Sequence, residues 1–162
     1  SDKIFNKSKS LNNKGYYFDL MTYEKYYVKN QTPTTPSVAH LFGLKYIIEK
    51  INKEGLDNRW NRHIEMANYA RLWAKEHNQT LFPEPGCESF TLTCINNIQN
   101  WDINLLNEKL LSRGFRMDRG YGSLRTKAFR VAHMGNIYMD DLREYLSIID
   151  ELIPEIKWNT KY

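Results

Sequence analysis

The stretch Lys127-Ala128-Phe129-Arg130-Val131-Ala132-His133 decides the fold, because it is an apolar β-strand that carries a single arginine. Phe129 and Val131 point to one side, and Arg130 points to the other side between two alanines. The preceding stretch Arg119-Gly120-Tyr121-Gly122 contains the glycines of a loop. The strand is therefore expected to lie in a sheet, with its apolar side packed and Arg130 on the other face.

Helical and strand patterns alternate on both sides of this strand. The predicted helices and strands, in chain order, lie at about 37–55, 57–78, 80–82, 89–95, 102–114, 115–117, 127–133 and 140–154. Within 89–95, apolar Phe90, Leu92 and Cys94 alternate with hydroxyl residues, which indicates a half-buried strand. The order α-α-β-β-α-β-β-α predicts an α+β fold, a two-layer sandwich.

Capping residues predict where these helices begin and end. Asp57 or Asn58 suits the N-cap of the second helix, and Asp102 suits that of the third. Asp140 and Asp141 suit the first turn of the last helix, which Pro154 is expected to stop.

Residues 1–36 differ from the rest of the chain. Asn and Lys are frequent up to Lys14, and a tyrosine-rich segment follows. We interpret this part as a polar turn and an irregular aromatic segment that packs on something outside this chain.

Composition excludes several classes of protein. The 162 residues are 41% hydrophobic, with a net charge of +4 and no apolar run near the roughly 18 residues of a membrane helix. Lys and Arg are scattered along the chain, which argues against a nucleic-acid-binding stripe. Cys87 and Cys94 are too few and wrongly spaced for a zinc site, so no metal is predicted, and they are typical of a reducing cytoplasm.

Two segments are candidates for binding anions. In Pro33-Thr34-Thr35-Pro36, Thr35 is expected to cap a helix that starts at Pro36, which leaves Thr34 beside a positive helix end. Arg130 offers a guanidinium fork to a planar carboxylate. Spacing alone favours plainer interpretations, in which the threonines only cap a helix and Arg130 faces solvent. His133 is interpreted as a packing or hydrogen-bonding histidine, because no nucleophile motif lies near it.

Three motifs in order resemble a known family. Residues 31–38 (QTPTTPSV), 54–63 (EGLDNRWNRH) and 129–135 (FRVAHMG) are similar to the C-terminal part of class V pyridoxal-phosphate aminotransferases, above all the alanine–glyoxylate and serine–pyruvate branch. The resemblance implies that 1–36 is a remnant of the large domain with an interdomain segment, and that 37–162 is the small C-terminal domain of a fold-type-I enzyme.

The resemblance also implies an activity and a set of site residues. It implies a homodimer that moves an amino group from a small amino acid to a 2-oxo acid such as glyoxylate or pyruvate. Gln31 and Thr34 would contact the phosphate of pyridoxal phosphate, and Arg130 would bind the substrate carboxylate. The Schiff-base lysine of the family matches a position upstream of Ser1, so the chain alone is expected to be inactive and no catalytic residue is assigned to it.

Two alternatives stay open. Other class V enzymes (desulfurases, lyases and epimerases) also bind an amino acid carboxylate, so Arg130 does not distinguish them. A mildly basic α+β module with exposed aromatic residues could instead bind single-stranded nucleic acid.

Overall fold

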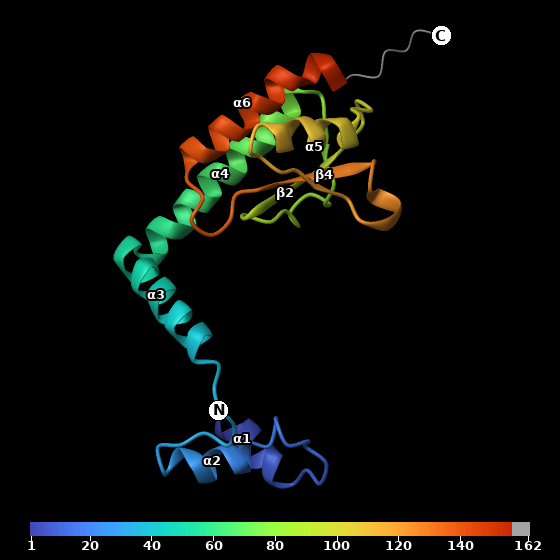
Figure 1. Cartoon of the computed structure of the whole chain (residues 1–162). Coiled ribbons are helices and arrows are strands. Elements are labelled where there is room, and N and C mark those ends of the chain that lie inside the picture. The colour runs from blue at the N-terminus through green and yellow to red at the C-terminus, as the bar shows by residue number, and fades with distance from the viewer. Residues whose placement is uncertain (157–162) are drawn as a thin grey trace. The chain divides into compact units, whose positions relative to one another are not determined.

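The computed structural model describes residues 1–156 of the chain. They divide into two compact units, Ser1–Lys50 and the part that begins at Ile51, and each is described by itself. The elements, in order, are α1 (Asp2–Lys9), α2 (Leu20–Tyr27), α3 (Val38–Glu54), α4 (Leu56–Glu76), β1 (Thr80–Leu81), β2 (Leu92–Asn96), α5 (Ile103–Ser112), β3 (Asp118–Arg119), the 3-10 turn η1 (Gly122–Leu124), β4 (Ala128–Ala132) and α6 (Met139–Ile156) (Figure 1). From residue 37 onward, this order confirms the predicted α+β arrangement. The expected domain boundary between residues 36 and 37 stays a prediction.

The second unit is built on a four-stranded antiparallel sheet with the strand order β1-β2-β4-β3. The register pairs Arg130 of β4 with Cys94 of β2 on one side and with Asp118 of β3 on the other. Helices α4, α5 and α6 lie together on one side of β2 and β4 (Figure 1). The two predicted layers are therefore this sheet and these helices.

A single apolar core joins the two layers. Phe129 and Val131 are completely buried, as the alternation predicts, and they pack with residues of α4, α5 and α6. The Phe129 ring stacks on Trp101 with the ring centroids 5.8 Å apart. Because each fully buried large apolar side chain contributes about 1.5–3 kcal/mol, this core holds β4 firmly against the helices.

In the second unit, helix ends differ from the capping predictions in two places. Gly55, with a φ of 84°, is the one residue between α3 and α4, so α4 begins at Leu56 and Asp57 lies in its first turn instead of capping it. Pro154 lies inside α6, because the helix continues to buried Ile156, whose carbonyl accepts a hydrogen bond from the Asp102 N–H. The predicted Asp102 cap is confirmed: its carboxylate accepts the N–H groups of the next turn.

Two predicted strands are shifted. Residues 115–117 form no strand, because the Met117 N–H donates to the Asn107 side chain and the Phe115 ring packs against Tyr145. The short strand β3 follows instead. Ser89 hydrogen-bonds to the Thr91 N–H, and the ladder of β2 starts only at Leu92.

The first unit is helical, so the expectation of an irregular segment in 1–36 was wrong. The Asp19 carboxylate caps α2 by accepting from the Met21 N–H and from the Thr22 hydroxyl. Helix α3 begins at Val38 instead of Pro36, and Ser37 accepts the Leu41 N–H at its start. Thr35 is therefore not the cap.

No helix between residues 1 and 156 is long and apolar enough to cross a membrane. In the same range, no group of His, Cys, Asp and Glu side chains is placed to hold a metal ion.

Candidate functional site

Arg130 lies near the middle of β4 with its guanidinium between an acid and an aromatic ring. Its Nη2 atom is 2.5 Å from Asp118 Oδ2, and its Cζ atom is 4.7 Å from the centre of the Tyr121 ring. The side chain is 22% exposed, against 53% for Asp118. Burial opposes the charge of Arg130, but Tyr121 and Asp118 outweigh it, so the pKa of the guanidinium is raised.

The Nε and Nη2 atoms form one edge of the Arg130 guanidinium, and this edge is buried beside Asp118. Within the described residues, Nε and Nη2 are buried and have no aligned hydrogen bond, although Nη2 contacts Asp118. These two nitrogens form the side-on fork that accepts a planar carboxylate. Arg130 lines a cavity of about 250 Å³ that Arg116, Ala132 and α6 also line. Arg130 can therefore bind a carboxylate in exchange for its contact with Asp118.

Cys94, the register partner of Arg130, is not an activated nucleophile. Its thiol is free and partly buried, and burial raises its pKa, although the nearby Arg130 charge acts in the opposite direction. A thiol with a raised pKa is protonated and weakly reactive near neutral pH.

His133 at the end of β4 is a structural residue. It is fully buried, and its Nε2 atom lies 2.9 Å from the Thr93 hydroxyl of β2. Burial, then the nearby His63 and Arg71 charges, lower its pKa to about 4. The imidazole is therefore neutral at physiological pH, in agreement with the expected hydrogen-bonding role.

The 54–63 motif holds the loop that follows β4. The Glu54 carboxylate accepts from Arg59 Nη1 at 2.8 Å and from Arg62 Nε at 2.7 Å. Arg59 Nη2 then donates to the Gly135 carbonyl at 2.9 Å, and Arg62 Nη1 donates to the Ile137 carbonyl. We call Glu54, Arg59 and Arg62 the clamp.

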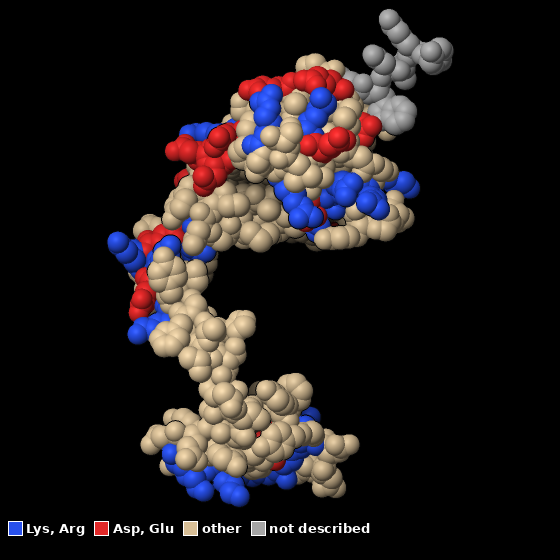
Figure 2. Space-filling model, in the orientation of Figure 1, with Lys and Arg blue, Asp and Glu red and all other residues tan. Residues whose placement is uncertain are grey.

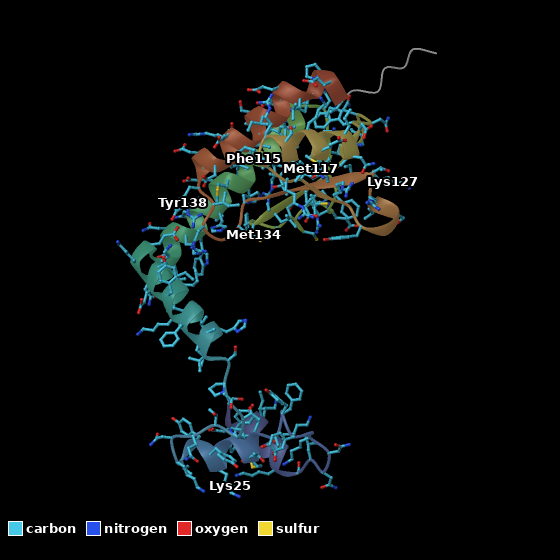
Figure 3. All side chains as sticks on the ribbon, viewed as in Figure 1. Lys25, Phe115, Met117, Lys127, Met134 and Tyr138 are labelled. Atoms are coloured by element: carbon cyan, nitrogen blue, oxygen red, sulfur yellow. The ribbon has the colours of Figure 1, made fainter. Side chains whose placement is uncertain are left out.

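The clamp acts at one end of β4, on a loop that also borders the Arg130 cavity. Met134 and Tyr138 lie beside α4, and Lys127 lies at the opposite end of the strand (Figure 3). The Arg62 guanidinium stacks on the Tyr138 ring at 4.6 Å. Ile137 lines the Arg130 cavity. Sequence reasoning missed this positioning role, although a glutamate followed by arginines five and eight residues later was a visible signal.

Gln31 and Thr34 belong to the first unit, whereas Arg130 belongs to the second. Both lie in an open hollow of about 540 Å³ that is lined by residues 31–36. The loop is held by a bond from the Tyr16 hydroxyl to the Pro33 carbonyl at 3.1 Å and one from the Thr32 hydroxyl to the Thr34 carbonyl at 2.7 Å. The half-buried Thr34 hydroxyl and the exposed Gln31 amide have no partner within residues 1–156. Both groups are thus free to donate to an oxyanion.

No protein-family model matches the chain. Among curated proteins, it is 28% identical to an uncharacterized aminotransferase of Methanocaldococcus jannaschii, over 99% of this chain and 43% of the relative. It is 27% identical to a protein named soluble hydrogenase, small subunit, of Synechococcus, over 96% of this chain and 41% of the relative. It is 28% identical to the L-aspartate–glyoxylate aminotransferase of Paracoccus denitrificans, over 75% of this chain and 31% of the relative. The chain spans about two fifths of the length of the first two relatives.

Solved structures have the same fold. An alanine–glyoxylate aminotransferase from Nostoc matches with a TM-score of 0.74 and 25% identity, over 95% of this chain and 40% of that one. A pyridoxamine–pyruvate aminotransferase from Mesorhizobium loti matches with a TM-score of 0.78 and 20% identity, over 95% and 42% of the two chains. These likenesses confirm the predicted fold of an aminotransferase C-terminal domain.

Proposed function

We propose that the protein containing this chain is a transaminase, on the premise that the chain corresponds to the C-terminal part of class V pyridoxal-phosphate aminotransferases of the alanine– or serine–glyoxylate type. The observation that carries the proposal is that Arg130 lines a cavity, while its Nε and Nη2 atoms have no aligned hydrogen bond within the described residues. In this proposal Arg130 binds the carboxylate of both the amino acid and the 2-oxo acid.

Arg130 would act by orienting the substrate. A side-on fork fixes a carboxylate in one plane, which holds the rest of the substrate in one orientation and lowers the entropic part of the barrier. Asp118 keeps the guanidinium in place before the substrate arrives, since its carboxylate lies 2.5 Å from Nη2. A lysine would supply the charge without the planar fork.

Gln31 and Thr34 fit the phosphate of pyridoxal phosphate. Each has a donor without a partner among residues 1–156, and the surrounding loop is held by two hydrogen bonds. When bound, the cofactor would supply the electron sink for amino transfer. In the family, a lysine within a recognisable motif carries the cofactor. None of the lysines of this chain lies in that motif, so we expect the chain alone to be inactive.

The finer parts of the proposal are a small amino donor of the alanine or serine type and glyoxylate or pyruvate as acceptor, in keeping with the names of the relatives. The proposal also includes a homodimer and a cytoplasmic location. A desulfurase, lyase or epimerase of the same class remains the alternative, because each would use Arg130 in the same way. A nucleic-acid-binding module is a more distant alternative.

The test is amino transfer by the full-length protein from L-alanine or L-serine to glyoxylate. Arg130→Gln and Arg130→Lys should each raise KM for every amino and oxo acid by about 10-fold to 100-fold, because a charge-assisted pair is lost or loses its fork. Thr34→Val should weaken cofactor retention, measured by dialysis and absorbance. Arg143→Gln, which alters an exposed ion pair on α6, is the matched control. Unchanged kinetics of the Arg130 variants would remove Arg130 from the site.

A further inference from the structure

Asp118 lies where a substrate carboxylate would bind. The register of β3 against β4 places it directly opposite Arg130, and its Oδ2 atom is 2.5 Å from Arg130 Nη2. Nη2 is one of the two nitrogens that a side-on carboxylate uses. The guanidinium therefore already holds an acidic group of the kind that it is proposed to bind.

The surroundings of the guanidinium bring a second carboxylate to the same edge. The Tyr121 ring covers Arg130, with Cζ 4.7 Å from the ring centre, and Cys94 is the register partner on the other neighbouring strand. The remaining fork consists of Nε and Nη2, which have no aligned hydrogen bond within the described residues. A carboxylate that binds side-on at this fork shares Nη2 with Asp118.

Sharing the guanidinium costs electrostatic energy. Two carboxylates on one guanidinium repel each other, and the repulsion is stronger where water is partly excluded. The cavity at Arg130 is lined by two acidic residues, Asp118 and Asp141, and by two arginines, Arg116 and Arg130. An incoming carboxylate thus adds a third negative charge, and Asp118 is the acid that it meets on the guanidinium itself.

Asp118 is free to leave Arg130. Its side chain is half-exposed, and its strand β3 is only two residues long. Arg116 lines the same cavity and makes no ion pair with any residue that the structure describes, so a second cation is available to the displaced carboxylate. Figure 2 shows Lys and Arg side chains gathered near β4, whereas Asp and Glu side chains gather along α6. A negative charge released from Arg130 therefore stays in positive surroundings.

We propose that Asp118 is an internal competitor, which limits the affinity of Arg130 for substrate carboxylates. This inference rests on the proposed function and deepens it, because it names the residue that controls how tightly the site binds. Without a substrate, Asp118 is paired with Arg130; a bound carboxylate takes over the fork, and Asp118 turns toward solvent and Arg116. A transaminase releases one acid and binds another at the same arginine in each cycle. A competitor that weakens both acids equally speeds the release of the product.

The test measures the binding of propionate, which has one carboxylate and no amino or oxo group, to the full-length protein by calorimetry. Asp118→Asn removes the competing charge and keeps an acceptor oxygen for Arg130, so the guanidinium retains its support. This variant should bind propionate about threefold to tenfold more tightly than the wild type, because the lost ion pair is half-exposed. The matched control is Asp140→Asn, which alters an exposed ion pair with Arg143 and should not change the affinity.

Three comparisons assign the gain to competition at Arg130. Propionamide, the uncharged analogue of propionate, should bind equally to the wild type and to Asp118→Asn. Asp118→Glu, which keeps the charge, should show no gain. In an Arg130→Gln background, Asp118→Asn should no longer change the affinity for propionate, because the competitor acts only through Arg130. Asp118→Ser is a second uncharged variant with an acceptor oxygen, for use if Asp118→Asn does not fold.

The failures of the two proposals are distinguishable. If Asp118→Asn binds propionate no more tightly than the wild type while Arg130→Gln weakens binding, Asp118 supports Arg130 and does not compete, and the inference is overturned. A gain that propionamide or Asp118→Glu also shows, or that persists in the Arg130→Gln background, would overturn it as well. If Arg130→Gln leaves propionate binding unchanged, the proposed function of Arg130 fails instead.

Discussion

His133 should make the stability of the chain depend on pH between 5 and 7. Its imidazole is buried and neutral, with a pKa lowered to about 4 by burial and by the nearby His63 and Arg71. In the unfolded chain the same group titrates near its ordinary value of about 6.5. As the pH falls below that value, the unfolded state binds a proton that the folded state does not bind. The free energy of unfolding is therefore highest above pH 6.5 and decreases as the pH falls toward 4.

The size of the effect follows from the two pKa values. Linkage gives a loss of about 2 kcal/mol by pH 5 relative to pH 7.5, which is large beside the usual 5–15 kcal/mol of a domain. His133→Gln removes the titration and keeps a side chain that can hydrogen-bond to Thr93. The variant should therefore lose about 2 kcal/mol less than the wild-type chain over this range.

Urea unfolding at pH 7.5, 6.5, 5.5 and 5.0 measures this difference, with the fluorescence of the buried Trp73 and Trp101 as the probe. Replacing the exposed His40 by Gln controls for the loss of an imidazole as such. If the wild-type chain and His133→Gln lose stability in parallel, His133 is not buried in its neutral form and the reasoning is refuted.

Three further substitutions test the contacts around the site, each by urea unfolding. Glu54→Gln should cost about 1–2 kcal/mol, because the amide loses the negative charge and replaces one of the two acceptor oxygens with a donor, and no loss would mean that the clamp contributes nothing. Asp102→Ala should cost about 1 kcal/mol through the lost N-cap of α5, and an unchanged midpoint would contradict the cap. Gly120→Ala should cost about 1–3 kcal/mol, because its Cβ atom would overlap the Leu124 carbonyl. The control is Gly43→Ala, whose Cβ atom meets nothing within 4 Å and should not destabilise the chain. Equal effects of the two substitutions would refute the close contact.

The spacing of apolar residues predicted most of the fold, because buried positions recur every two residues in a strand and every three to four residues in a helix. The strand that carries Phe129 and Val131, the helix after Asp102, and the apolar side of the last helix all lie where the pattern places them. The errors arose where a tertiary contact outweighs a local signal. Pro154 does not stop α6, because burial of Ile156 holds the last turn in place.

Strand β2 shows why a pattern does not predict which face is buried. Phe90, Leu92 and Cys94 are the apolar set, yet Thr93 is 3% exposed and Phe90 is 51% exposed. Thr93 can be buried because its hydroxyl is paired with His133, 40 residues away in sequence. That partner is not visible from local spacing, and a buried hydroxyl without it would be costly.

The candidate site was predictable only residue by residue. The isolated arginine between two alanines indicated Arg130, but its partner Asp118 was hidden in the 115–119 segment, where the strand was predicted three residues too early. The pairing of Asp118 with Arg130 depends on the register of β3 against β4, which requires the tertiary structure.

Strand β4 is held by contacts at both edges and at its end, which explains why it can present Arg130 in one orientation. Antiparallel pairing with β2 and β3 holds both edges of the strand, and the buried bond between His133 and Thr93 holds its end. The clamp then holds the following loop through the Gly135 and Ile137 carbonyls. The motifs at 54–63 and 129–135 are far apart in sequence, but hydrogen bonds join the first motif to the loop that contains the end of the second. In the proposed function Arg130 positions the substrate carboxylate, and positioning tolerates little displacement. Substitutions in the clamp should therefore weaken the proposed substrate binding at Arg130, although the clamp lies outside the Arg130 cavity.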